Sequence, residues 1–325
     1  MKQLFKLTLA TSLLFAHGAF AADSETFLEA PGPQGPLKAI FLVPNGARAT
    51  DAPIVLIIPG SGPTDHDGNG PLGLKAAPYR LLAESLARDG VSTVRIDKRG
   101  MFASASAIPD ANKVSIQDYA NDVHVWISAI KAKTGASCVW VLGHSEGGLV
   151  ALAAAQHPDG LCGLILIATA GRTLGAVLRE QITANPANAP LLVDAESTIT
   201  KLEHAEHVEV SSMHPALQRL FAPAVQDFLM SSMSLNPAVL LGAYRGQVLI
   251  LQGDNDLQVG VEDAELLGKA NAPAKVVILP GVNHVLKAVE GKTRAANFST
   301  YGDPTLPLAD GIAPAVAGFI RAQRR

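Results

Sequence analysis

The sequence has few cysteine and aromatic residues and little charge of either sign. Of its 325 residues, 17% are charged and 5% are aromatic, and the formal net charge is −3. No run of basic residues occurs apart from the stretch 321–325. Neither nucleic acid nor an anionic membrane is therefore an expected partner. The hydrophobic fraction of 48% is instead sufficient for a sizeable buried core.

Residues 1–21 have the composition of a secretory signal peptide. Lys2 and Lys6 precede an apolar stretch at 7–15, and Ala19-Phe20-Ala21 supplies a cleavage motif of the A-x-A kind. The apolar stretch is short for a membrane span, and no cysteine near the motif could carry a lipid anchor. We therefore expect cleavage after about Ala21 and a periplasmic or secreted bacterial protein without stable membrane association.

The two cysteines, Cys138 and Cys162, each lie just before a stretch expected to form a buried strand. These strands are expected to be neighbours in a parallel sheet, and an exported protein permits disulfides. A bridge would close a loop of about 24 residues and contribute about 3 kcal/mol in the chain-entropy model. Two small buried thiols would fit the same sequence, which leaves both possibilities open.

Buried strands and amphipathic helices alternate along most of the chain. Continuous apolar runs predict strands at 53–58, 91–96, 139–142, 163–168, 247–252 and 275–279. Helical periodicity predicts helices at 79–88, 115–133, 149–156, 261–269 and 309–322. Two shorter strand candidates, 27–29 and 38–43, flank a segment rich in Pro and Gly and are expected to form a peripheral hairpin. The alternation predicts an α/β fold with a mostly parallel central sheet and helices on both faces.

The alternation stops between residues 171 and 246. This stretch lacks a convincing strand and carries short helix-like pieces that are broken by prolines. A structureless loop of such length is uncommon inside a compact domain. We therefore predict a helical cap at 171–246, inserted into a core formed by 22–170 and 247–325.

A serine lies where the strand at 139–142 runs into Gly-His-Ser-Glu-Gly-Gly and a helix of small residues. A G-x-S-x-G pattern between a strand and a helix is the nucleophile elbow of α/β-hydrolases, in which the serine stands at the apex of a tight turn. Gly143 and Gly147 are expected to prevent collisions where strand and helix meet. Ser145 is accordingly the predicted nucleophile, and His144 is expected to pack against a neighbouring loop.

A serine nucleophile needs a general base, and the base needs an acid that orients it. In this fold the acid and then the histidine follow the nucleophile along the chain. The segment after the strand at 247–252 contains both Asp254 and Asp256. We favour Asp256, three residues after Gly253, because the turn must first leave the sheet; Asp254 remains the alternative. His284 is the predicted base because it follows the acid and lies directly after the last strand.

Two backbone N–H groups are needed to stabilise the oxyanion of the tetrahedral intermediate. The residue after the nucleophile, Glu146, is expected to supply one, and the loop after the strand at 53–58 is expected to supply the other. In that loop Ser61 is the expected donor. Gly60 and Gly62 beside it let the backbone turn inward without side-chain collisions.

The same loop contains Asp65-His66-Asp67-Gly68-Asn69, which superficially resembles a calcium-binding loop. The rest of the EF-hand spacing is missing, so a turn closed by Asx hydrogen bonds is the better interpretation. His204 and His207 have helical spacing, but no third ligand stands near them in the sequence. No metal site is therefore predicted.

Over essentially its whole mature length the chain resembles the α/β-hydrolase superfamily, and more closely a group of bacterial serine esterases. The motifs that carry the resemblance are Pro59-Gly60-Ser61-Gly62-Pro63 with Asp65, Asp67, Gly68 and Asn69, then Asp97-Lys98-Arg99-Gly100, Gly143-His144-Ser145-Glu146-Gly147-Gly148, the acid loop 253–259, and Asn283-His284-Val285-Leu286-Lys287. The resemblance implies hydrolysis of carboxylic esters through an acyl-enzyme, without a cofactor. Met101-Phe102-Ala103-Ser104 departs from these relatives, which often have a further glycine and serine there, and this bears on the substrate range rather than on the reaction.

The sequence thus predicts an exported serine hydrolase that cleaves small-molecule carboxylic esters. Ser145 attacks the carbonyl carbon, His284 transfers the proton and Asp256 holds the imidazole. A peptidase or amidase with the same triad is the main alternative, and a non-catalytic exported binding protein with a vestigial triad is another. The natural substrate, the selectivity between esters and amides and the oligomeric state are not determined by the sequence.

Overall fold

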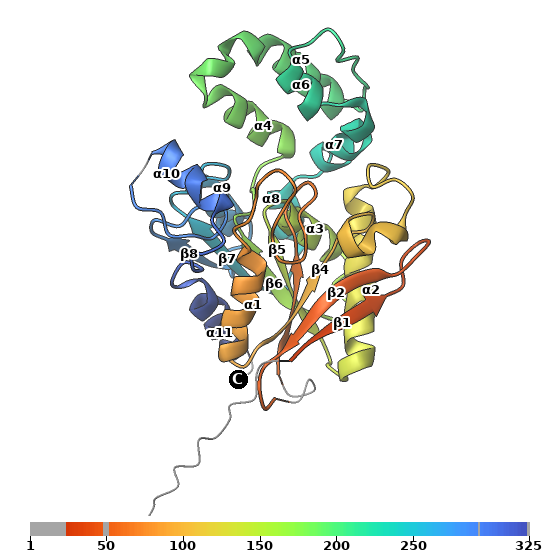
Figure 1. The fold of residues 1–325 in the computed structure, drawn as a ribbon, viewed down its shortest axis with the longest axis vertical. Helices are drawn as coiled ribbons and strands as arrows, with labels where there is room; N and C mark the ends of the chain where they lie inside the picture. Colours follow the sequence, from red (N-terminus) through yellow and green to blue (C-terminus); the bar gives the residue numbers. More distant parts are fainter. Residues whose placement is uncertain (1–23, 48–51, 292, 324–325) are drawn as a thin grey trace, which may run out of the picture.

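The computed structural model describes residues 24–47, 52–291 and 293–323, so the predicted signal peptide lies outside the described residues. An eight-stranded sheet forms the centre, in the order β1-β2-β4-β3-β5-β6-β7-β8 (Figure 1). The strands are β1 Ser24–Ala30, β2 Leu37–Val43, β3 Ile54–Ile58, β4 Ser92–Ile96, β5 Val139–His144, β6 Leu161–Ile167, β7 Gln247–Gly253 and β8 Lys275–Leu279. β2 pairs antiparallel with β1 and β4, and all other neighbours pair parallel. The predicted parallel sheet and its peripheral hairpin are confirmed.

Helices cover both faces of the sheet, as the continuous apolar strands require. On one face pack α1 Pro78–Arg88 and α11 Ile312–Ala322, and on the other pack α2 Ile116–Thr134, α3 Glu146–Ala154 and α9 Val261–Ala270. Successive residues of β3 alternate between the two core layers: Leu56 packs in one, and Val55 and Ile57 pack in the other. The central strands are therefore buried on both sides, which fixes the position of the loops that follow them.

Both bounds of α2 follow from signals in the sequence. Ser115 caps α2, because its hydroxyl accepts from the Asp118 N–H while the Asp118 carboxylate accepts from the Ser115 N–H. Gly135 ends α2 with φ 72°, as a C-cap glycine does. α3 begins at Glu146, directly after the serine, and thus three residues earlier than its periodicity predicts. The short helices η1 Phe102–Ala107, α10 Arg294–Ser299 and η4 Thr300–Gly302 were not predicted, although Thr293 caps α10 by accepting the Ala296 N–H at 3.2 Å.

Between β6 and β7 the described chain forms helices only, as expected. They are α4 Leu174–Thr183, η2 Pro186–Leu191, α5 Leu192–Glu203, α6 Pro215–Leu220, η3 Pro223–Val225, α7 Gln226–Met233 and α8 Pro237–Ala243. α4 to α7 form a separate layer at the top of Figure 1, with an apolar cluster of their own that includes Ile199, Leu202 and Phe221. α8 instead packs on the core side, where Leu241 joins the cluster beneath α3 and α9. The limits 171 and 246 for a cap unit stay a prediction.

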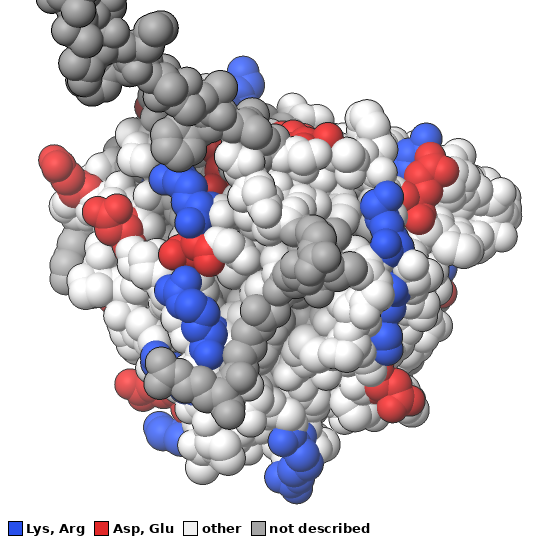
Figure 2. All heavy atoms as spheres, turned by 90° about the horizontal axis from the view of Figure 1, so that it is seen from below, with Lys and Arg blue, Asp and Glu red and all other residues white. Residues whose placement is uncertain are grey.

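Cys138 and Cys162 are joined in a disulfide, with their Cα atoms 5.1 Å apart. The bridge links the starts of the neighbouring strands β5 and β6, so of the two possibilities left open by the sequence, the structure has the bonded one. Among the described residues, no helix combines the length and the apolar character needed to cross a membrane. On the face opposite the helical layer, basic and acidic side chains are interspersed (Figure 2).

Candidate active site

Ser145 lies in the turn between β5 and α3, as predicted. Its backbone has φ 55° and ψ −121°, a conformation that is strained for any residue except glycine. A Cβ on Gly143 would collide with the carbonyl of Gly147, and a Cβ on Gly147 would collide with the carbonyl of Ile58. The Ser145 N–H donates to the carbonyl of Ile167 at 2.9 Å and ties the turn to β6. The serine is therefore held in a strained turn at the carboxyl edge of the sheet.

Asp256 and His284 meet at the same edge, from the loops after β7 and β8. The Asp256 Oδ2 lies 2.7 Å from the His284 Nδ1, and the Asp256 Oδ1 accepts the backbone N–H groups of Gln258 at 2.7 Å and Val259 at 3.0 Å. Burial raises the pKa of Asp256, but the facing imidazole and the two N–H donors outweigh it, so the net pKa is below the usual range. An ionised Asp256 thus faces the ring of His284.

Asp254, the alternative acid, takes another role in the structure. Its Oδ1 accepts the backbone N–H of Gly281 at 2.6 Å, which joins the loop after β7 to the loop after β8. Asp256, and not Asp254, carries the carboxylate that contacts His284. The three-residue offset from Gly253 was the signal that separated the two.

The loop after β3 approaches the elbow closely. A Cβ on Gly60 would lie 3.4 Å from both the ring of His144 and the Cβ of Ser145, which is ordinary van der Waals contact, so the loop and the elbow pack directly against each other at this glycine. Gly62 has φ 68°, which favours glycine. Ser61 and Glu146 line one cavity together with Ser145. The structure thus brings together the two predicted oxyanion donors and the predicted nucleophile.

The remainder of this loop is closed by the Asx hydrogen bonds that the sequence suggested. The Asp65 Oδ1 accepts the backbone N–H of Asp67 at 2.9 Å and that of Asn69 at 2.8 Å. The carboxylate of Asp97, after β4, accepts from the His66 N–H at 2.7 Å and lies 3.0 Å from the His66 Nδ1. Within the part of the chain that the structure describes, no group of three His, Cys, Asp or Glu side chains is placed to hold a metal ion.

A buried chain of hydrogen bonds connects three loops of the site. The Gly60 N–H donates to the Tyr79 hydroxyl at 2.9 Å, the hydroxyl lies 2.9 Å from the His144 Nδ1, and the His144 Nε2 lies 2.8 Å from the His284 carbonyl oxygen. Burial, followed by the nearby His284, lowers the pKa of His144 to about 3. A neutral ring with its proton on Nε2 satisfies every one of these contacts. The sequence predicted that His144 packs against a loop, but it missed Tyr79, which lies in α1.

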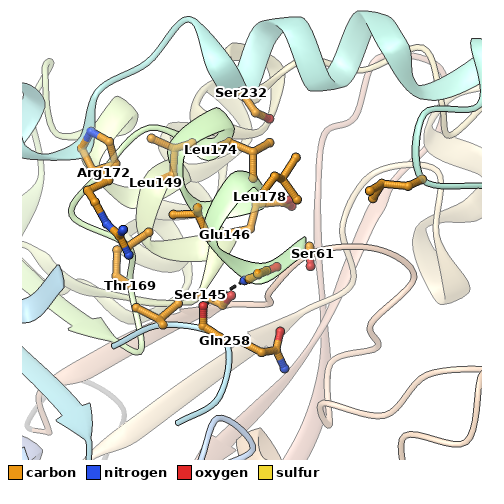
Figure 3. A pocket seen from close by; sticks show the side chains of 16 residues that line it. Ser61, Ser145, Glu146, Leu149, Thr169, Arg172, Leu174, Leu178, Ser232 and Gln258 are labelled. Carbon is orange, nitrogen blue, oxygen red and sulfur yellow. Dashed lines mark hydrogen bonds between the residues drawn. The ribbon is translucent and has the colours of Figure 1, made fainter. Parts of the chain in front are cut away.

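Two cavities meet at Ser145. The larger, of about 290 Å³, lies below the helical layer, and Figure 3 shows its labelled side chains around Ser145. Its apolar wall consists of Leu149, Leu174, Val177, Leu178, Leu220 and Val259. The smaller, of about 110 Å³, is lined by His284 together with Thr64, Leu74 and Tyr301. A reacting group at Ser145 therefore has a roomy apolar side and a confined side next to the histidine.

Comparison with known proteins places this geometry in a family. The model of the family described as serine aminopeptidase, S33, matches residues 72–287, about two thirds of the chain. This span includes the elbow, the acid loop and His284, whereas the loop of Ser61 precedes it. No curated protein matches the sequence.

Several solved hydrolase structures share the fold. Est1E from Butyrivibrio proteoclasticus superposes with a TM-score of 0.55 at 17% identity, over 92% of this chain and 98% of that one. The esterase Pf2001 from Pyrococcus furiosus has a TM-score of 0.56 at 12% identity, over 92% and 93% of the two chains. 2-Hydroxy-6-oxo-6-phenylhexa-2,4-dienoate hydrolase from Rhodococcus sp. strain RHA1 has 0.53 at 20% identity, over 92% and 100%. At these identities the similarity to the solved structures concerns the fold alone. The match to the family model shows in addition that the chain belongs to the serine aminopeptidase S33 family of α/β-hydrolases.

Proposed function

We propose that the protein is an exported serine hydrolase that cleaves carboxylic esters through an acyl-enzyme. One observation carries this proposal: a serine in a strained turn shares a cavity with a histidine whose Nδ1 lies 2.7 Å from a buried carboxylate. Strain of this kind costs free energy and persists where function uses it. Family membership supports hydrolysis, and the choice of esters rests on the lining of the cavities.

In the proposed reaction the Ser145 hydroxyl oxygen attacks the ester carbonyl carbon while the His284 Nε2 accepts the hydroxyl proton. The N–H groups of Ser61 and Glu146 stabilise the resulting oxyanion. The intermediate then loses its alkoxide, which takes the proton from His284 and leaves as an alcohol. Water attacks the acyl-serine with His284 again as the base, which releases the acid. Asp256 stays ionised because its pKa is lowered, and it stabilises the imidazolium.

The charges around Ser145 favour esters over aminopeptidase substrates. A free N-terminal ammonium group in a confined pocket needs an unpaired carboxylate beside it. Among the described residues that line the two cavities, Glu146 alone has a carboxylate, and its Oε1 already lies 3.1 Å from the Lys98 Nζ. The other charged lining residue, Arg172, is bound by Asp263 at 2.7 Å. The cavities are therefore suited to neutral, apolar acyl groups.

Export is supported by two independent features. Residues 1–21 have the pattern of a cleaved signal peptide, and the bond between Cys138 and Cys162 belongs to an oxidising compartment. Expression of the full-length chain in a bacterial host tests this proposal. We expect N-terminal sequencing of the exported protein to begin near Ala22, and an uncleaved product in the cytoplasm would contradict export.

The activity is tested with a panel of esters beside aminoacyl and peptidyl amides. We expect the wild-type protein to hydrolyse esters, a fluorophosphonate to label Ser145, and Ser145→Ala to abolish both. Amide turnover without ester turnover would establish the peptidase alternative. A native protein that the fluorophosphonate does not label would instead indicate a vestigial triad and a binding function.

A further inference from the structure

Lys98, in the Asp97-Lys98-Arg99-Gly100 segment after β4, has no role in the reaction described above. Its side chain is 3% exposed, although burying an ammonium group is costly unless hydrogen bonds and an opposite charge compensate. The groups that surround this ammonium therefore indicate what it is used for.

The ammonium contacts the two segments that carry the proposed oxyanion donors. The Lys98 Nζ donates to the Gly60 carbonyl oxygen at 2.7 Å and to the Glu146 Oε1 at 3.1 Å. The ring of Tyr119 lies beneath it, with the centroid 5.2 Å from the Nζ. One cation thus joins the loop after β3 to the first residue of α3.

The contact with Gly60 determines the direction of one donor. The Gly60 carbonyl and the Ser61 N–H belong to a single peptide unit, and the described chain contains no cis peptide bond. In a planar trans peptide the C=O and N–H bonds point in opposite directions. Fixing the oxygen towards Lys98 therefore directs the Ser61 N–H away from Lys98. A charged donor on the carbonyl also polarises the peptide unit and strengthens its N–H as a hydrogen-bond donor.

We propose that Lys98 is a positioning residue of the oxyanion hole, which sets the plane of the Gly60–Ser61 peptide and holds it against the start of α3. This inference rests on the proposed function, because it concerns the N–H groups that stabilise the tetrahedral intermediate. The Tyr79 hydroxyl, which accepts the Gly60 N–H at 2.9 Å, holds the preceding peptide unit. Tyr79 and Lys98 thus fix both peptide units that flank the Gly60 Cα.

The test compares Lys98→Met with the wild-type protein. The main readout is the second-order rate at which a fluorophosphonate labels Ser145, since phosphonylation uses the same hole whatever the natural leaving group. Removal of one complete oxyanion donor lowers kcat about 100- to 1000-fold, and a misdirected donor should cost no more than that. We therefore expect the labelling rate and the kcat for an ester to fall about 10- to 100-fold, with KM within about twofold of the wild-type value. Values of kcat are normalised to the labelled fraction, so that misfolded molecules do not contribute.

Two further variants separate positioning from charge balance and from general stability. If Lys98 served only to neutralise Glu146, the double variant Lys98→Met/Glu146→Gln would regain the lost rate; we expect it to stay as slow as Lys98→Met. Arg99→Met is the matched control, because Arg99 is the adjacent cation and binds the Asp122 carboxylate of α2 at 2.6 Å. We expect Arg99→Met to lower the thermal midpoint and to keep the wild-type labelling rate.

The possible outcomes are distinct. A wild-type protein that is labelled and hydrolyses esters, beside a Lys98→Met variant with the same labelling rate and kcat, would overturn the role of Lys98 alone. Recovery in the double variant would also overturn it, in favour of charge neutralisation. A wild-type protein that is neither labelled nor active would overturn the proposed function, and the inference about Lys98 with it.

Discussion

His144 makes the folded protein sensitive to acid in a way that can be measured. Its ring is 5% exposed and neutral, with Nδ1 accepting from the Tyr79 hydroxyl and Nε2 donating to the His284 carbonyl. Burial raises the pKa of Tyr79, so its hydroxyl keeps the proton that it donates. A protonated His144 would lose its acceptor and place a charge in the core, and we predict that replacing it by Gln removes this sensitivity.

The magnitude follows from the pKa of the ring in the two states. Burial lowers the pKa of His144 from 6.5 to about 3 in the folded protein, so the unfolded chain binds its proton first as the pH falls. The stabilisation from the neutral ring is complete above pH 6.5 and is lost progressively between pH 6.5 and 3. At 1.36 kcal/mol per pKa unit, a change from pH 7 to pH 5 costs about 2 kcal/mol through this one residue.

The assay is urea unfolding at pH 7 and pH 5, followed by far-ultraviolet circular dichroism. We expect the free energy of unfolding to fall by about 2 kcal/mol more in the wild type than in His144→Gln. His144→Gln is also expected to be less stable at pH 7, since the Tyr79 hydroxyl and the His284 carbonyl each lose a partner at about 1–3 kcal/mol. His124→Gln on α2 is the matched control, because it removes one histidine and leaves the hydrogen bonds between Gly60, Tyr79, His144 and His284 in place.

Equal pH differences in the wild type and in His144→Gln would refute this reasoning. Such a result would mean that the folded protein accommodates a charged His144, and that the Tyr79 and His284 contacts do not require the neutral tautomer. A loss of the pH difference in His124→Gln as well would show that the effect comes from histidine content in general. The hydrogen bonds of a neutral His144 with Tyr79 and His284 are supported only if the fall in the free energy of unfolding from pH 7 to pH 5 becomes smaller in His144→Gln and stays unchanged in His124→Gln.

Three further outcomes are expected. Replacing Cys138 and Cys162 by Ser removes a cross-link between residues 24 positions apart and should lower the free energy of unfolding by about 3 kcal/mol. A urea midpoint equal to that of the oxidised wild type would contradict a stabilising role of the disulfide. Gly147→Ala, whose Cβ would strike the Ile58 carbonyl, should slow fluorophosphonate labelling by about 100-fold or more, and labelling at the wild-type rate would show that the elbow tolerates a side chain. His284 lines the smaller of the two cavities and not the larger, so the leaving alcohol should lie in the smaller cavity and the acyl chain in the larger. The kcat/KM for methyl octanoate should then exceed that for its isomer heptyl acetate about tenfold, the equivalent of about two buried methylene groups. Equal values of kcat/KM for the two esters would argue against this orientation.

The sequence by itself determined the elements of the sheet and the order of the reacting groups. Continuous apolar runs identified the buried strands, because a strand covered on both faces has no solvent-exposed face and therefore no alternating polar residues. Gly143 and Gly147 marked the elbow, because only a turn that brings strand and helix into collision needs glycine at both places. His284 followed from its position after β8, since the carboxyl ends of parallel strands meet at one edge. The position after β7 left two candidate acids, and the sequence favoured Asp256 over Asp254 while the structure decided between them.

Only the tertiary structure decided which groups hold the site in place. β3 lies between β4 and β5 in the sheet, so Lys98, from the loop after β4, reaches both Gly60 in the loop after β3 and Glu146 at the start of α3. Tyr79 contacts His144 across 65 residues of sequence. No local pattern encodes such contacts, because they depend on strand order and on the angle at which α1 packs. The structure also decided the state of the two cysteines, because the sequence placed them before neighbouring strands but allowed either a disulfide or two buried thiols. A sequence motif identified the nucleophile because its unusual backbone conformation requires particular residues. The supporting side chains, Tyr79 and Lys98, have no such local requirement and were recognisable only in the structure, where the sheet brings their segments together.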